Sequence, residues 1–328
     1  MRPRDAPRSR EDAIGYYDGW VDRVGIADMQ QAIALSWTQP GGYHPRGWHR
    51  YLQGSERTWA IAFVVPYVAV LLVFAAYPVA YGLWMASAPS LYAELFASDE
   101  YGDALVTTLL YVGIGVNITM FLSLLLSGFF MRRRWWIKAL LVLSMLPWAL
   151  PAQPAFISIH WMLIYPGYID ALCWHLFGFD GPDWFNNYWS ALGSNILAST
   201  WKTMPFWTLI LLAGRMAIPQ DLYDAAAIDG ASGFQRFSRL VVPLLANLYL
   251  ACTLLAALWM IGDFVTPDMV SSGAPDGSTD VLATFGVDSM LDDGKPALGI
   301  AASLSALPLL IPLAVGLMRT LQTREVQL

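Results

Sequence analysis

Long apolar runs without charge, separated by short polar connections, dominate the pattern of this chain. A helix needs about 20 apolar residues to cross the roughly 30 Å hydrocarbon core of a membrane. Six runs reach this length: 59–85, Asp103 to Arg132, Lys138 to Asp170, about Leu192 to Arg215, Arg239 to Asp263, and Lys295 to Arg319. The pattern therefore predicts an all-α membrane protein with six transmembrane helices within residues 59–320.

The composition agrees with lipid as the solvent for most of the chain. Of the 328 residues, 56% are hydrophobic and only 13% are charged, whereas a soluble domain carries about 25% charged residues. The net charge is −6, and no basic stripe interleaved with aromatic residues suggests a nucleic-acid partner. We expect membrane lipid, and no nucleic acid, around this chain.

The basic residues are sorted to one side of the predicted spans. Seventeen of the nineteen Lys and Arg residues precede the first span, follow the last, or lie in the second–third and fourth–fifth connections; the two others are Lys202 and Lys295. Basic connections face the cytoplasm, so both termini are predicted to be cytoplasmic, in a multi-pass protein of the bacterial cytoplasmic (inner) membrane.

Residues 1–58 are predicted to form a separate cytoplasmic segment, and residues 321–328 a cytoplasmic tail. Ser9 with Asp12 resembles a capping box that opens a helix. An apolar face would follow on that helix, made of Ala13, Tyr17, Trp20, Val21 and Val24. The segment is either an amphipathic helix on the inner leaflet or on a partner subunit, or a loosely ordered tail.

The chain offers no constellation for catalysis or metal binding. Cys173 and Cys252 are predicted to lie in different environments and not to pair, and the four histidines show no close ligand spacing. There is neither a nucleophile–base set nor a Walker motif. We therefore expect no enzyme activity, no catalytic residue, no metal and no cofactor in this chain.

The connection between the fourth and fifth predicted spans, about residues 216–240, has its own helical signals. Pro219 suits the first turn of a helix, and Gly230 can end that helix in the left-handed conformation. Ser232 with Gln235 forms a second capping box, which predicts another helix directly afterwards. The small side chains of Ala225 and Ala226 would let another protein approach the backbone of the first helix closely.

This connection resembles the EAA loop of importer permeases. Asp224-Ala225-Ala226 stands at the Glu-Ala-Ala motif, with Asp in place of the usual Glu; Gly230 stands at the following glycine, and Val242-Pro243 at the later hydrophobic–proline pair. The run from Trp201 to Pro219 is similar to the segment that leads into this loop in sugar permeases. The resembled family is the permease subunits of binding-protein-dependent ATP-binding-cassette importers of the carbohydrate type, such as maltose, trehalose and glycerol-phosphate permeases.

The resemblance implies a type I importer permease that forms half of the path for a sugar, polyol or related solute. It implies three protein partners: a second homologous permease subunit, an ATPase dimer that uses ATP and Mg, and an extracytoplasmic substrate-binding protein. The short helix would be the coupling helix that docks on the ATPase. The residues implied in coupling are Asp224, Ala225, Ala226, Asp229, Gly230 and Ala231.

Two alternatives to a sugar importer remain at this point. The stretch from Ile261 to Pro267 resembles polyamine-type permeases of the same importer class. A secondary transporter working alone is less favoured, because the sequence has a docking loop and shows no clear internal repeat.

Proline residues at membrane depth indicate where the substrate path runs. Pro147, Pro151 and Pro154 interrupt the third predicted span, and broken helices often border substrate sites, although a packed kink is the alternative. Lys202 either faces the path or reaches outward to water. The candidates for the substrate path are Gln153, Trp161, Trp201 and Lys202.

The predicted external loop before the last span, Ser271 to Thr279, is rich in Gly, Ser and Pro. It resembles the loop of sugar permeases that approaches the binding protein, and an ordinary external turn is the alternative. Its candidate contacts are Gly273, Pro275 and Thr279.

Overall fold

A computed structural model describes residues 56–132, 134–308, 310–312, 314–316 and 319. The predicted helix beginning near Ser9 and the tail 321–328 lie outside the described residues. The chain divides into two compact units, residues 1–72 and 73–328. In the first unit, the described residues form α3 (Glu56–Leu71), which continues the chain into the π-helix η2 (Leu72–Ala76).

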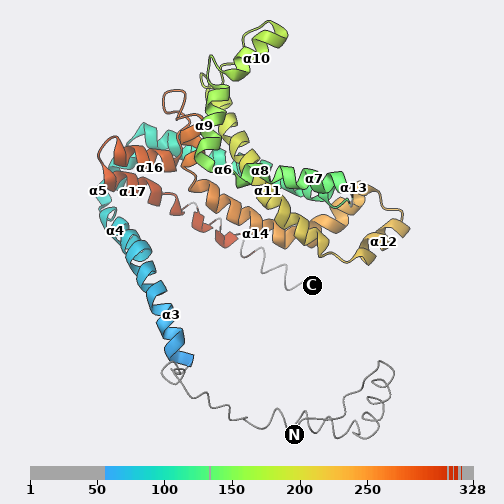
Figure 1. The fold of residues 1–328 in the computed structure, drawn as a ribbon. Coiled ribbons are helices and arrows are strands. Elements are labelled where there is room, and N and C mark those ends of the chain that lie inside the picture. Colours follow the sequence, from blue (N-terminus) through green and yellow to red (C-terminus); the bar gives the residue numbers. More distant parts are fainter. Residues whose placement is uncertain (1–55, 133, 309, 313, 317–318, 320–328) are drawn as a thin grey trace, which may run out of the picture. The chain divides into compact units, whose positions relative to one another are not determined.

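The described part of the second unit is helical throughout its regular structure, as the sequence predicted (Figure 1). Its helices are α4 (Tyr77–Met85), α5 (Pro89–Phe96), α6 (Asp99–Phe130), α7 (Trp135–Ser144), α8 (Leu146–Ala149), α9 (Ala152–Leu163), α10 (Tyr168–Phe177), α11 (Tyr188–Met216), α12 (Gln220–Ile228), α13 (Gly233–Arg236), π-helix η3 (Phe237–Val241), α14 (Val242–Ile261), α15 (Val265–Val270), α16 (Leu282–Leu291) and α17 (Pro296–Leu304).

Four helical segments among the described residues are long and apolar enough to cross a membrane, and a bent pair makes up to five. The four are Ile61–Met85, Asp99–Phe130, Tyr188–Met216 and Gly233–Ile261. They confirm the first, second, fourth and fifth predicted spans. Helices dominate because a backbone in lipid must satisfy its own hydrogen bonds.

The third predicted span is a broken one. Its two parts, Trp135–Ala149 and Ala152–Leu163, meet at an angle of 94°. The bend falls at Leu150 and Pro151, both in extended backbone conformation. Pro151 and Pro154 lack the N–H groups that would continue the helix, which explains the position of the break.

The sixth predicted span is interrupted in the described residues. Helix α17 ends at Leu304, Ser305 and Ala306 form a turn, and helical residues resume at Leu307. Pro308 follows directly, and its ring suits the first turn of a new helical segment. The continuous run of apolar residues did not reveal this turn.

The core of the second unit lies between α6, α11 and α14. Tyr111, Met120, Trp207 and Leu211 are almost completely buried there. Small polar side chains join the same helices: the Thr119 hydroxyl lies 2.9 Å from that of Thr200, an arrangement common between membrane helices. This packing fixes α6 and α11 side by side, and both contribute to the sites described next.

Candidate functional site

The loop that resembles the EAA motif forms a short helix with a fully bonded end. Helix α12 starts after Pro219 and ends at Ile228, and Gly230 has φ +71°. The Gly230 amide donates to the Ala227 carbonyl (3.1 Å), and the Ala231 amide donates to the Ala226 carbonyl (3.0 Å). These two bonds make a Schellman motif, which requires a left-handed residue. The predicted role of Gly230 at the helix end is confirmed.

A second helical segment follows at once. The Ser232 hydroxyl accepts a hydrogen bond from the Gln235 amide (3.3 Å), and the Gln235 side chain accepts one from the Ser232 amide (2.7 Å). This is the predicted capping box. Helix α13 then passes through the π-helix η3 into α14, so the loop is continuous with a membrane span. Figure 1 shows α12 projecting beyond the packed helices.

Helix α12 has no buried residue and offers a surface for another protein. Asp224, Ala225, Asp229 and Gly230 are exposed, and Ala226 and Ala231 are half-buried. Large apolar side chains flank them, with Ile228 87% and Phe234 77% exposed. Apolar surface at the tip of a projecting loop is typical of a protein interface.

A buried arginine fixes the base of this loop. Arg215, near the end of α11, donates from Nε to the Ser127 hydroxyl (2.8 Å) and from Nη2 to the Leu124 carbonyl (2.9 Å), both on α6. Its guanidinium also lies over the Phe237 ring of η3, 5.5 Å from the centroid. One side chain therefore connects α6, α11 and the segment that follows α12 and α13.

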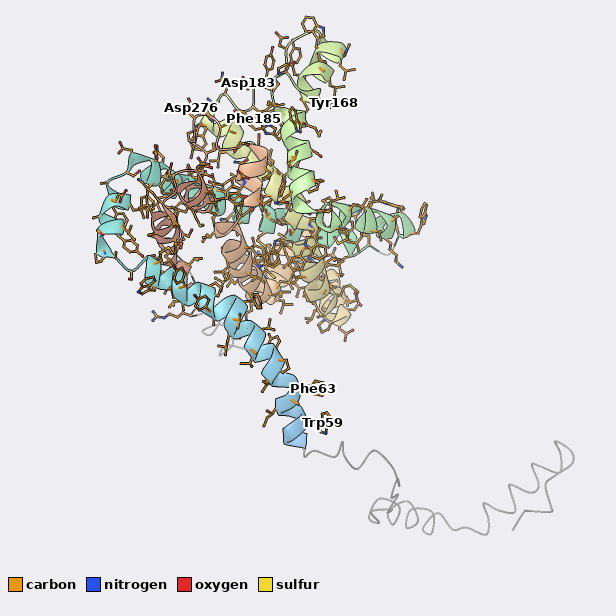
Figure 2. All side chains as sticks on the ribbon, turned by 60° about the vertical axis from the view of Figure 1, so that its left-hand side comes forward. Trp59, Phe63, Tyr168, Asp183, Phe185 and Asp276 are labelled. Atoms are coloured by element: carbon orange, nitrogen blue, oxygen red, sulfur yellow. The ribbon has the colours of Figure 1, made fainter. Side chains whose placement is uncertain are left out.

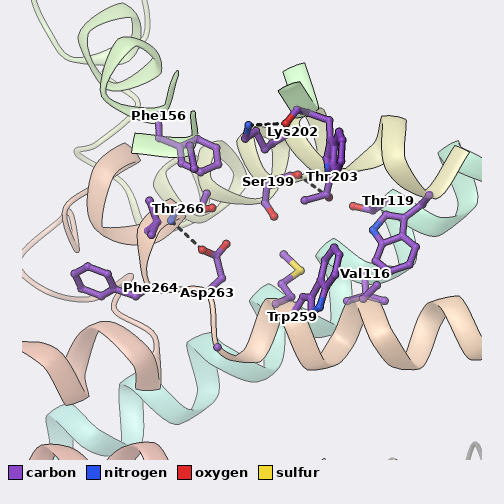
Figure 3. Close-up of a pocket in the computed structure, with 17 residues that line it drawn as sticks. Val116, Thr119, Phe156, Ser199, Lys202, Thr203, Trp259, Asp263, Phe264 and Thr266 are labelled. Carbon is purple, nitrogen blue, oxygen red and sulfur yellow. Dashed lines mark hydrogen bonds between the residues drawn. The ribbon is translucent and has the colours of Figure 1, made fainter. Parts of the chain in front are cut away.

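A cavity of about 400 Å³ opens between α6, α11, α14 and the broken span. It is lined by aromatic rings and by hydroxyl and charged groups (Figure 3). The aromatic residues are Trp148, Phe156, Trp207, Trp259 and Phe264, and the polar ones are Thr119, Ser199, Lys202, Thr203, Asp263 and Thr266. Aromatic faces combined with a few polar groups suit a small hydroxylated molecule.

Lys202 lies in the wall of this cavity and does not reach outward to water. Its ammonium nitrogen donates to the carbonyl oxygens of Pro147 (2.8 Å) and Trp148 (3.3 Å) and to that of Leu150. Pro147 and Trp148 belong to α8, and Leu150 lies in the break between α8 and α9. Figure 3 shows the side chain directed to that backbone.

Asp263 is the other charged group of the cavity, and it was absent from the candidates chosen by sequence. Its carboxylate accepts hydrogen bonds from the Tyr111 hydroxyl (2.8 Å) and from the Thr266 amide (3.1 Å). Asp263 and Thr266 belong to the stretch Ile261 to Pro267, which was singled out in the sequence for its resemblance to polyamine-type permeases. That motif was the signal that could have identified them.

The remaining substrate-path candidates do not gather around the cavity. Gln153, Trp161 and Trp201 are exposed on the described chain, Trp161 by 65%. Of the four, only Lys202 lines the cavity. The side chains that do line it come from helices far apart along the chain, which sequence spacing alone does not bring together.

The loop from Ser271 to Thr279, which was predicted to be external, is a tightly bonded structure. The Thr279 hydroxyl donates to the Ala274 carbonyl (2.7 Å) and lies 3.1 Å from that of Ser271, to which Asn195 of α11 donates (2.8 Å). Gly273 and Thr279 are buried and Pro275 is half-buried. Asp276 and Gly277 are the exposed tip, and Figure 2 shows Asp276 at the same end of the unit as Asp183.

Carboxylates cluster behind this loop. Burial, together with the negative charges of neighbouring aspartates, chiefly Asp280 and Asp268, raises the pKa of Asp288 to about 6. Burial is also the main cause that raises the pKa of Asp280.

Comparisons with known proteins agree with this arrangement. The family of binding-protein-dependent transport system inner membrane components matches residues 82–324. The trehalose/maltose transport system permease protein MalF of Thermococcus litoralis is 29% identical over 244 residues, covering 70% of this chain and 82% of that protein. The sulfoquinovosyl glycerol permease SmoG of Agrobacterium fabrum is 29% identical over 256 residues, covering 73% and 82%.

A solved structure shares the fold. A chain of a bacterial ABC transporter involved in the import of the acidic polysaccharide alginate aligns with a TM-score of 0.67 at 19% identity, covering 84% of this chain and 99% of that chain. The family match spans most of the chain and includes α12 and the cavity. The chain belongs to the family of inner membrane components of binding-protein-dependent transport systems.

Proposed function

We propose that this chain is one permease subunit of an ATP-driven, binding-protein-dependent importer for a sugar, polyol or related solute. The single observation that carries this function is the projecting α12 with its Schellman end, on a chain of this family. A permease of this kind forms part of the transport path and does not itself hydrolyse ATP. ATP and Mg would be used by a separate ATPase dimer.

The carbohydrate class is supported by the relatives and by the cavity. The similar proteins named above are permeases for trehalose and maltose and for sulfoquinovosyl glycerol. Rings such as those of Trp148 and Trp259 can stack on the apolar faces of a sugar, while Thr119 and Ser199 can exchange hydrogen bonds with its hydroxyls. The cavity would be this subunit's part of the path, completed by a second homologous permease.

A cationic, polyamine-type substrate is the second candidate, and Asp263 is the observation that favours it. A carboxylate beside three tryptophans could attract an ammonium group. However, both carboxylate oxygens already accept hydrogen bonds from Tyr111 and Thr266. The sugar, polyol or related class remains the proposal, because the similar proteins named above are sugar permeases.

The assembled transporter provides the test of this function. The chain should copurify with an ATPase and a second permease, and its extracytoplasmic binding protein should stimulate ATP hydrolysis when loaded with a neutral oligosaccharide. Spermidine added with the same binding protein is the control for the cationic class. Stimulation by spermidine alone would replace the carbohydrate assignment, and copurification without an ATPase would contradict the importer.

The six-span topology makes a separate prediction about orientation. With both termini and α12 cytoplasmic, a cysteine at Gln220 is expected to react with an impermeant thiol reagent only after the cells are opened. A cysteine at Asp276, at the exposed tip of the loop from Ser271 to Thr279, should react in intact cells, in a background where Cys173 and Cys252 are replaced by serine. Labelling of both positions in intact cells would reverse or overturn the topology.

A further inference from the structure

We infer that Lys202 is a positioning residue that completes the hydrogen bonding of the broken third span. It is not, on this inference, a ligand for the transported molecule. Only the transport test below rests on the proposed function, because the contacts of Lys202 are with the chain's own backbone.

The break between α8 and α9 leaves backbone carbonyls without their ordinary partners. In a continuous helix the Pro147 carbonyl would accept from residue 151 and the Leu150 carbonyl from residue 154. Both of those residues are prolines and have no N–H. Even in a continuous α-helix these two carbonyls would lack their i+4 donors, and unpaired carbonyls at membrane depth are costly.

Lys202 supplies what the prolines remove. An ammonium group has three N–H donors and no acceptor, and this one donates to three carbonyls: Pro147, Trp148 and Leu150. Two of them are the carbonyls opposite the prolines. A cation is also favourable where helix carbonyls end, because they carry partial negative charge.

The number of N–H donors also limits what Lys202 can do for a substrate. With all three donors used by the backbone, the ammonium has no proton left to offer to a solute in the cavity. The side chain is only 9% exposed, so it acts chiefly on the wall. Its effect is to hold α11 against the 94° bend and so keep the cavity open between them.

The test uses thermal unfolding of the purified transporter complex and does not need transport. Lys202→Met keeps the length and removes all three donors, and is expected to lower Tm by about 5 °C or more. Lys202→Arg, which keeps charge and donors, should recover at least half of that loss. The decisive variant adds Pro151→Ala and Pro154→Ala to Lys202→Met, because the two alanines restore N–H groups opposite the orphaned carbonyls.

The proline replacements should change Tm in opposite directions, depending on whether residue 202 is lysine or methionine. Combined with Lys202→Met they should raise Tm, and with Lys202 intact they should lower it, since they take acceptors from a buried ammonium. Pro66→Ala with Pro78→Ala is the matched control, because these prolines lie in the first span and no described bond joins their surroundings to Lys202. The inference would be overturned if the control pair raised the Tm of Lys202→Met equally, or if Pro151→Ala with Pro154→Ala changed Tm in the same direction with and without Lys202.

Transport then separates a positioning residue from a ligand. In proteoliposomes at a temperature where Lys202→Met remains folded, the preference between a neutral and an anionic sugar should stay within about twofold of that of the unmodified protein. A changed preference that the proline replacements do not restore would make Lys202 a substrate ligand. Failure of uptake by the unmodified transporter would count against the proposed function alone, since the unfolding measurements stand without it.

Discussion

Replacing Gly230 by valine is expected to reduce binding-protein-stimulated ATP hydrolysis about tenfold while the membrane helices stay inserted. Gly230 has φ +71°, a region that costs an L-residue about 1–2 kcal/mol and a β-branched residue more. About 1.4 kcal/mol corresponds to a tenfold change in an equilibrium. The Schellman end that shapes α12 would therefore be lost in most molecules, and docking on the ATPase would weaken accordingly.

The chain offers a matched control three residues away. A side chain at either Gly230 or Gly233 would meet no atom within 4 Å, but only Gly230 has a positive φ. Gly233→Val should therefore keep most of the stimulated hydrolysis, and Gly230→Asn should lose less than Gly230→Val, because Asn tolerates the left-handed region. Equal losses at 230 and 233 would show that surface contact, and not the turn, is responsible.

A bulky substitution tests the same helix without changing its backbone. Ala226→Trp would place a large ring on a half-buried position of the proposed docking face. We expect the ATPase to copurify poorly with this variant. Normal copurification and normal stimulated hydrolysis in both Gly230→Val and Ala226→Trp would exclude α12 as the coupling element.

The conformation of the loop that carries α12 could be predicted from sequence because its signals are local. Proline before a helix, glycine after it and a capping box each depend on residues within four positions of one another. The observed φ of Gly230 and the paired bonds of Ser232 and Gln235 follow these rules. No packing partner was needed to determine them.

The cavity could be predicted only in part because its walls come from distant segments. Prolines in the third span correctly indicated a break, and of the two alternatives left open for Lys202 the structure shows a position in the cavity wall. The exposure of Gln153, Trp161 and Trp201 depends on how α9 and α11 turn against the other helices. The same holds for Asp263, whose partner Tyr111 lies 152 residues away along the chain.

The loop from Ser271 to Thr279 shows a different limit of prediction from sequence. Gly273, Pro275 and Thr279 were chosen because the loop resembles one that approaches a binding protein. Loop composition does not distinguish residues that make contact from residues that hold the loop's shape. Thr279 is fully buried and bonded to Ala274 and Ser271, so contacts with a binding protein would come from the tip at Asp276 and Gly277.

Replacing Arg215 by methionine is expected to uncouple the transporter more than any other single change at the base of the loop. Arg215 is 7% exposed and makes two hydrogen bonds to α6 as well as the contact with Phe237. Hydrogen bonds to a charged group contribute about 1.5–3 kcal/mol each. Gly128 of α6 leaves room for this guanidinium, since a Cβ there would lie 3.0 Å from Nη1.

The expected effect on transport follows from the contacts of Arg215 with α6 and η3. We expect a displacement of α12 to reach α6 through the ends of α11 and η3, which the guanidinium joins by its hydrogen bonds to α6 and its contact with Phe237. Without it, we expect ATP hydrolysis to continue at a raised basal rate while uptake per ATP falls about tenfold, an effect of roughly 1.4 kcal/mol. Arg215→Lys should give an uptake per ATP between that of the unmodified protein and that of Arg215→Met, because lysine keeps the charge but not the planar donor pair.

The matched control for Arg215→Met removes an arginine that is exposed. Arg134→Met changes the second–third connection and should leave both rates unchanged. Hydrolysis and uptake are measured together in proteoliposomes, so that each variant gives a ratio as well as two rates. A proportional loss of both rates in Arg215→Met would indicate simple destabilisation, and unchanged uptake per ATP would remove Arg215 from the coupling route.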